Sequence, residues 1–122
     1  MSTATTELIE TSRIFPPHPA HETAKLAALV ASMQAEGWQG RPLLVLEIAE
    51  GFLALTGSHR YAAARKAGLE EIPCVLASID HATFEAEYGP IIGMDDEDLL
   101  SALREAGDEA AATLMAEEIA AN

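Results

Sequence analysis

One stretch in the middle of the sequence changes from the pattern of a strand to the pattern of a helix within three residues. The apolar residues 52–55 have strand length, and the alanine-rich residues 58–67 end at Gly68, a common position for a helix end. Gly57 stands between the two patterns, where glycine permits a tight backbone turn. The stretch therefore predicts a strand, a glycine turn and a short helix, with Ser58 as the candidate N-cap.

The segments on either side of this turn also alternate between strand and helix patterns. Strand patterns occupy residues 7–14, 43–48 and 72–76, and an amphipathic helix pattern runs from Glu22 to Gly37 after a proline-rich loop. Only 5% of the residues are aromatic, and alanine and leucine dominate the apolar ones, which suits helices packed closely on a sheet. We expect an α/β or α+β fold, a small mixed sheet with packed helices in the order β-α-β-β-α-β.

The last third of the sequence differs in composition from the rest. After Asp80, alanine and acidic residues dominate, and apolar residues at helical spacing predict two helices broken at Gly107. Residues 1–80 carry nine acidic and six basic side chains and residues 81–122 carry eleven and one, so they contribute −3 and −10 to the net charge of −13. We expect one small α/β domain over 1–80 and an acidic helical extension over 81–122. The extension is either a solvated helical face or a functional segment, which docks a basic partner or mimics the charge of a nucleic acid.

The charge of the chain and the lack of certain patterns narrow the functional classes. Proteins that coat duplex DNA neutralise its phosphates with Lys and Arg, so an acidic chain is a poor candidate for direct DNA binding. No run approaches the roughly 20 apolar residues of a membrane span, and the N-terminal residues lack a signal-peptide pattern. The single cysteine, Cys74, allows no intramolecular disulfide. We expect a cytoplasmic protein with no membrane partner.

The residues at the start of the central helix have the chemistry of a phosphate-binding site. A helix N-terminus presents unpaired backbone N–H groups and a partial positive charge, which stabilise an anion. Gly57 lets the backbone approach that anion closely, and Ser58 adds a hydroxyl. His59 adds a switchable donor, and Arg60 a planar fork that can bind two phosphate oxygens. We call residues 57–60 the phosphate cradle; the alternative is an ordinary helix start with solvated polar residues.

The motifs around the cradle resemble those of the ParB N-terminal domain and sulfiredoxin superfamily. The resemblance covers residues 14–76: a proline loop, a helix ending in Gly, a strand after Pro, a strand leading to a Gly-x-x-Arg helix start, then Ala67-Gly68-Leu69 and Ile72-Pro73. The corresponding motif is Gly-Glu-Arg-Arg in ParB proteins and Gly-Cys-His-Arg in sulfiredoxin, and both bind nucleotide phosphates. The resemblance therefore implies a ParB/sulfiredoxin-like fold that binds a nucleotide at Gly57-Ser58-His59-Arg60, which is nearer the sulfiredoxin form.

Two departures from these families argue against their activities. Sulfiredoxin uses the cysteine of its motif as nucleophile, and the matching position here is Ser58, whereas Cys74 lies in a predicted strand. ParB partition proteins carry a basic helix-turn-helix domain after this one, and here an acidic segment follows instead. We therefore expect neither sulfinic acid reductase activity nor centromere binding by this chain alone.

An ADP-dependent free-serine kinase of the same superfamily suggests further site residues. The resemblance lies in a His-Glu pair before the first helix, which makes Glu22 a candidate general base or Mg²⁺ ligand; a glutamate placed at a helix N-terminus is the alternative. Arg65 either adds positive potential around a triphosphate or is a solvated residue near the helix end. His18 and His21 form a His-x-x-His pair without a third ligand, and we predict no metal site there.

These observations lead to three hypotheses for function. The first is a nucleotide-binding module that holds a nucleoside triphosphate, ATP or CTP, with Mg²⁺ as a candidate companion, and regulates a protein partner. The second is an enzyme, an ATPase or a phosphotransferase acting on a small hydroxylated metabolite. The third is an acidic interaction domain that keeps the fold without a nucleotide.

Overall fold

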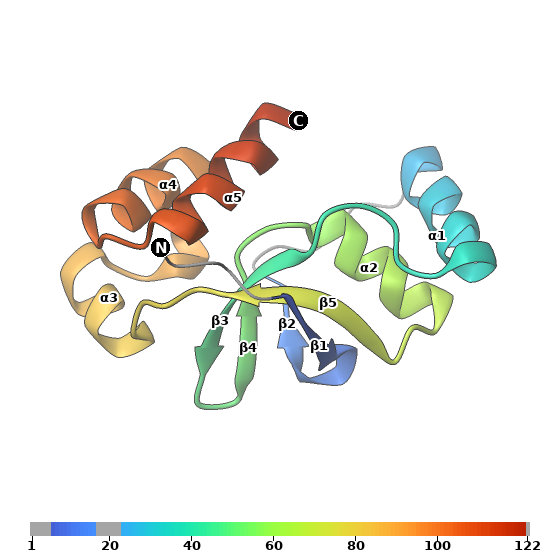
Figure 1. The fold of residues 1–122 in the computed structure, drawn as a ribbon, viewed down its shortest axis with the longest axis horizontal. Coiled ribbons are helices and arrows are strands. Elements are labelled where there is room, and N and C mark those ends of the chain that lie inside the picture. Colours follow the sequence, from blue (N-terminus) through green and yellow to red (C-terminus); the bar gives the residue numbers. More distant parts are fainter. Residues whose placement is uncertain (1–5, 17–22, 122) are drawn as a thin grey trace.

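A five-stranded mixed sheet forms the centre of the computed structural model, which describes residues 6–16 and 23–121. The strand order is β1-β5-β3-β4-β2, with parallel pairs β3/β5 and β2/β4 and antiparallel pairs β1/β5 and β3/β4 (Figure 1). The strands are β1 (Thr6–Glu10), β2 (Ile14–Phe15), β3 (Leu43–Ile48), β4 (Gly51–Ala54) and β5 (Glu71–Leu76). The predicted class, a small mixed sheet with packed helices, is confirmed.

Helices cover both sides of this sheet. Helices α1 (Ala24–Glu36) and α2 (Ser58–Ala67) lie on one side, and α3 (His81–Tyr88), α4 (Asp96–Glu105) and α5 (Glu109–Ala121) lie on the other (Figure 1). Short 3₁₀ helices span Thr11–Arg13 and Ile91–Gly93. The arrangement is a three-layer sandwich in which the sheet separates two sets of helices.

Strand β3 shows why the molecule has two hydrophobic cores. Successive residues of a strand point to opposite faces of the sheet. Leu43 and Val45 belong to the core under α1 and α2, whereas Leu44 and Leu46 belong to the core under α3, α4 and α5. A strand buried on both faces is apolar without alternation, and this explains the unbroken apolar run at residues 43–46.

Side-chain caps explain where most of the helices begin. Thr23 accepts a hydrogen bond from the backbone N–H of Leu26 (3.1 Å) at the start of α1, and Asp95 accepts one from Asp98 (2.8 Å) at the start of α4. Asp108 is buried and has two partners: Oδ1 accepts from the N–H of Ala111 (3.1 Å) in α5, and Oδ2 from the N–H of Ser78 (2.7 Å) after β5. Asp108 thereby ties the start of α5 to the end of the sheet.

The structure corrects two sequence predictions about local structure and adds two features that were not predicted. The strand predicted over residues 7–14 is interrupted by a 3₁₀ turn and gives β1 and β2, which lie at opposite edges of the sheet. Helix α3 was not predicted, and the N-cap of α2 is Gly57 rather than Ser58. Pro73 lies inside β5, an inner strand, but pairing with β3 begins only at Cys74, so at the proline β5 has a strand on one side alone.

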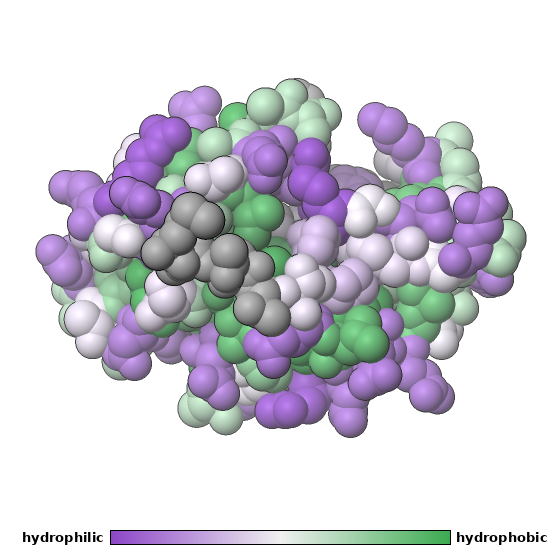
Figure 2. Space-filling view, viewed as in Figure 1, coloured by the Kyte–Doolittle hydropathy of each residue, from purple (hydrophilic) through white to green (hydrophobic). Residues whose placement is uncertain are grey.

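Hydrophilic and apolar residues both reach the outer surface. Hydrophilic residues line much of the rim of the molecule, with apolar patches showing between them (Figure 2). Within residues 6–16 and 23–121, the exposed large apolar side chains are Leu8, Phe15 and Ile92. Among the described residues, no helix has the length and apolar character that crossing a membrane requires.

Candidate anion-binding site

The turn that leads into α2 depends on a glycine for two separate reasons. Gly57 has φ 75° and ψ 39°, the left-handed region in which a side chain is unfavourable. A Cβ at this position would also collide with Cδ2 of Leu43 on β3. Gly57 supplies no side-chain cap, in contrast to the residues at the starts of α1, α3 and α4. The backbone can therefore turn tightly and leave the first turn of α2 open to an external acceptor.

The side chain of Arg60 folds back over this turn. A Cβ placed on Gly57 would come within 3.0 Å of Nη2 of Arg60, and one on Gly40 within 3.3 Å of its Cδ. Nη1 donates a hydrogen bond to the backbone carbonyl of Arg41 at 2.6 Å. The loop that carries this carbonyl is itself held by Trp38, whose Nε1 donates to the carbonyl of Gly40 at 3.0 Å. Two glycines thus make room for the guanidinium beside the start of α2.

A carboxylate from the far end of the sequence completes the site. Nη2 of Arg60 donates to Oε1 of Glu118, on α5, at 2.6 Å, and the two side chains are only 13% and 15% exposed. Nε of Arg41 lies 3.5 Å from Oε2 of the same carboxylate, and its side chain is 40% exposed. Two arginines therefore hold one carboxylate, and one of them, Arg60, belongs to the residues that were predicted to bind a phosphate.

The N-terminal part of the chain, which forms this turn, matches a known family. The ParB N-terminal domain model matches residues 2–89. The chain belongs to the ParB N-terminal domain family. None of the curated proteins matches it.

Solved structures show the same fold. Sulfiredoxin from Arabidopsis thaliana is 24% identical, with a TM-score of 0.56 over 67% of this chain and 94% of that one. The C-terminally truncated chromosome-partitioning protein ParB from Caulobacter crescentus, complexed with CTP-gamma-S, is 19% identical, with a TM-score of 0.55 over 88% and 70%. A free serine kinase in complex with AMP is 24% identical, with a TM-score of 0.52 over 63% of this chain and only 32% of the kinase. The ParB/sulfiredoxin-like fold predicted from the sequence is confirmed.

The structure places three of the other predicted site residues along α2. Ser58 is half-buried as the first residue of α2, and His59 is exposed beside it. Arg65 lies beyond them along α2, where Nη1 donates to the hydroxyl of Tyr61 (3.1 Å) and the guanidinium lies over that ring. Glu22 lies outside the described residues. The roles of all these residues in binding stay predictions.

The structure adds three residues that sequence reasoning missed. Gly40 and Arg41 follow the end of α1, and a Gly-Arg pair before a predicted strand has no distinctive pattern. Glu118 is one of several glutamates in an acidic segment, and nothing in its neighbours distinguishes it. Only the packing of α5 on the sheet brings Glu118 to Arg60, which is 58 residues away in the sequence.

Metal-binding and cysteine chemistry have little support in the described part of the chain. Among residues 6–16 and 23–121, His, Cys, Asp and Glu side chains form no group of three or more that could hold a metal ion. His18 and His21 lie outside those residues. Cys74 is buried in β5, and burial raises the pKa of its thiol to about 12, so the reactive thiolate is strongly disfavoured.

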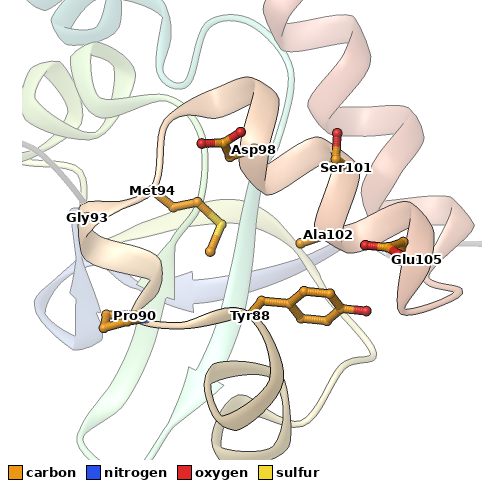
Figure 3. A pocket seen from close by; sticks show the side chains of 8 residues that line it. All are labelled: Tyr88, Pro90, Gly93, Met94, Asp98, Ser101, Ala102 and Glu105. Atoms are coloured by element: carbon orange, nitrogen blue, oxygen red, sulfur yellow. The ribbon is translucent and has the colours of Figure 1, made fainter.

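A cavity lies on the opposite side of the sheet from α2 (Figure 3). It has a volume of about 420 Å³ and is bounded by the end of α3, the following loop and one face of α4 (Figure 3). Apolar parts of Tyr88, Met94 and Ala102 line it, and the carboxylates of Asp98 and Glu105 lie at its margin (Figure 3). Burial, with the charges of Glu87 and Glu105, raises the pKa of Tyr88. No arginine or lysine lines this cavity, so it is unsuited to phosphate.

Proposed function

We propose that this protein is a nucleotide-binding module that holds the phosphates of a nucleoside triphosphate at residues 57–60 and so regulates a protein partner. One observation carries the proposal: the Arg60 guanidinium lies over Gly57 at the start of α2 and is paired with an oxyanion there, the carboxylate of Glu118. A phosphate group offers the same kind of negatively charged oxygen to the same donors. The open first turn of α2 adds backbone N–H groups and the positive end of the helix dipole.

Solved structures with this fold support a nucleotide, rather than an isolated phosphate, as the ligand of this chain. The ParB structure contains CTP-gamma-S, and the free serine kinase structures contain AMP or ADP. Both ATP and CTP are therefore candidates for this chain. Mg²⁺ is a candidate companion, because it is usually bound through substrate phosphates, water and one or two carboxylates.

The acidic helices are the candidate surface for the partner. Residues 81–122 contribute −10 to the net charge, and α4 and α5 present most of their carboxylates to solvent. Such a surface is complementary to a basic protein, and electrostatic attraction of this kind speeds association at low salt. The same charge disfavours direct binding of DNA by this chain.

The enzyme hypothesis needs a residue that the described structure does not contain. An ATPase or phosphotransferase would use Glu22 as base, and Glu22 lies outside residues 6–16 and 23–121. Release of inorganic phosphate distinguishes the two functions. The nucleotide-binding module predicts tight binding with slow or no turnover, whereas the enzyme predicts Mg²⁺-dependent turnover that Glu22→Gln abolishes while binding survives.

Calorimetric titration of ATP, ADP, CTP and GTP, each with and without Mg²⁺, tests the proposal in the full chain. We expect saturable binding of a nucleoside triphosphate by the wild-type protein and a loss of roughly ten- to a hundredfold in affinity in Arg60→Ala, since hydrogen bonds to charged groups contribute about 1.5–3 kcal/mol. Arg60→Lys keeps the charge but not the planar fork and should recover only part of the affinity.

Arg104→Ala is the matched control, because it removes an exposed arginine from the last turn of α4 without touching the cradle. It should bind nucleotide as the wild type does. Equal weakening in Arg104→Ala and Arg60→Ala would mean that only overall charge matters. Wild-type affinity in Arg60→Ala would contradict the proposal.

A further inference from the structure

The carboxylate of Glu118 occupies the donors that a bound phosphate would need. It accepts from Nη2 of Arg60 at 2.6 Å and lies 3.5 Å from Nε of Arg41. A guanidinium edge that is engaged with one carboxylate cannot give the same hydrogen bonds to a phosphate. Arg60 and Glu118 are both largely buried in this contact, so it is not an incidental surface pair.

We propose that Arg41 and Arg60 form one oxyanion site and that Glu118 is its built-in ligand, so that the nucleotide's phosphate and the end of α5 compete for it. The inference rests on the proposed function and adds two things to it, a second phosphate-binding residue and an internal competitor. The C-terminal helix covers the site when no nucleotide is bound, and phosphate binding releases it.

The packing of α5 allows its last turns to leave the site without unfolding the rest of the helix. The first part of α5 is anchored by the buried residues Ala111, Ala112 and Met115 and by the cap from Asp108. Beyond Met115 the burial falls: Glu118 and Ile119 are half-buried, and Ala120 and Ala121 are exposed. Local opening at a helix end costs far less free energy than global unfolding. The ion pairs of Glu118 are thus the polar contacts that hold the end of α5 at the cradle.

Competition of this kind lowers the apparent affinity for nucleotide by a predictable factor. When only a fraction of molecules has the arginines free, the apparent dissociation constant rises by the inverse of that fraction. A charge-assisted pair of this type corresponds to roughly a tenfold preference for the covered state. Removing the charge of Glu118 should therefore tighten nucleotide binding by about the same factor.

The first experiment compares nucleotide affinities of single-charge variants in the full chain. We expect Glu118→Gln to bind ATP or CTP about tenfold more tightly than the wild type. Glu117→Gln is the matched control, because it removes one negative charge from the adjacent, exposed position of the same helix and should change the affinity less than twofold. Adding Arg41→Ala to Glu118→Gln should weaken binding severalfold, since the second arginine is lost.

Hydrogen exchange of the wild-type protein gives a second readout, with Arg60→Ala as its control. Saturating nucleotide should increase amide exchange in the last turns of α5, after Met115, and leave the first turns unchanged. Arg60→Ala should show no such response to nucleotide.

The outcomes separate this inference from the proposed function. If binding depends on Arg60 but Glu118→Gln binds no more tightly than Glu117→Gln, or nucleotide leaves exchange in α5 unchanged, the competition is overturned and the proposed function stands. If neither the wild type nor Glu118→Gln binds any nucleotide, both are overturned.

Discussion

The two sides of the sheet differ in charge and in their relation to known proteins. The side covered by α1 and α2 lies within the residues that match the ParB N-terminal domain, and it carries Gly57 and Arg60. On the other side, α4 and α5 lie beyond the match at residues 2–89, and residues 90–122 carry nine acidic side chains and one basic one, a net −8 of the total −13. The part of the chain that matches the family thus provides the donor Arg60, and the acidic part beyond it provides the acceptor carboxylate of Glu118.

The proposed competition is therefore between a cradle that lies in the family part of the chain and a carboxylate that lies outside it. Helix α5 packs on the same sheet as the family part, through residues such as Met115, and its end places Glu118 on Arg60. A change of a few residues in α5 would alter the occupant of the cradle without altering the cradle itself. The division into a domain over 1–80 and an extension over 81–122 stays a prediction, and unfolding experiments can test it.

The largest expected effect is a loss of stability when a side chain in the core under α3, α4 and α5 is shortened. Leu103 is fully buried, and Leu103→Ala should lower the free energy of unfolding by about 2–5 kcal/mol, as large-to-small core substitutions do. Leu26→Ala is the matching substitution in the core under α1 and α2, where Leu26 is only 2% exposed. Chemical denaturation of both variants checks the comparison. A loss below about 1 kcal/mol in Leu103→Ala alone would mean that the acidic helices are not part of one cooperative unit.

The second expected effect concerns the two glycines at the ends of α2, where the same substitution should cost different amounts of stability. Gly57 and Gly68 both have positive φ, 75° and 81°, but a Cβ would meet Leu43 at the first and open space at the second. We expect Gly57→Ala to destabilise the protein by about 2–4 kcal/mol, from backbone strain and overpacking together. Gly68→Ala should cost only about 1 kcal/mol. Thermal denaturation measures both, and equal losses would contradict the close approach of β3 to the turn.

The smallest effect concerns a carboxylate on the acidic side, at the start of α3. The backbone N–H and the hydroxyl of Thr83 both donate to Asp80, and these bonds lower the pKa of its carboxyl below the ordinary 3.8. A lowered folded-state pKa adds stability above the ordinary value, and this stability is lost as the pH falls through the folded value. In Thr83→Ala the Asp80 pKa, followed by NMR, should rise toward 3.8. An unchanged pKa would show that the cap is not formed in solution.

The sequence predicted the elements that depend on local patterns. Residues 58–67 end at Gly68 as predicted, because helix propensity and a C-terminal glycine are both local. The 3₁₀ turn between β1 and β2 was not predicted. It separates two short strands that lie at opposite edges of the sheet, and this separation depends on the topology of the whole sheet rather than on a local pattern. Ser58 was predicted as the N-cap, but the structure has Gly57 there, because the left-handed backbone of Gly57 marks the boundary of the helix.

The candidate site was only partly predictable for a related reason. Gly57 and Arg60 belong to one contiguous motif whose chemistry can be recognised without a fold. Arg41 and Glu118 reach the same place only through the loop after α1 and the packing of α5. Contacts between residues this far apart are decided by how both faces of the sheet are covered, which no local pattern in this sequence encodes.

Amide chemical shifts followed during a nucleotide titration test the central claim most directly. On addition of CTP or ATP to the wild-type protein, the backbone amides of residues 58–60 should shift and saturate with a single dissociation constant, together with those near Arg41 and Glu118. Arg60→Ala should lose these shifts at the same nucleotide concentrations. Saturable shifts confined to the cavity beside Tyr88, or no shifts at the start of α2, would contradict the account.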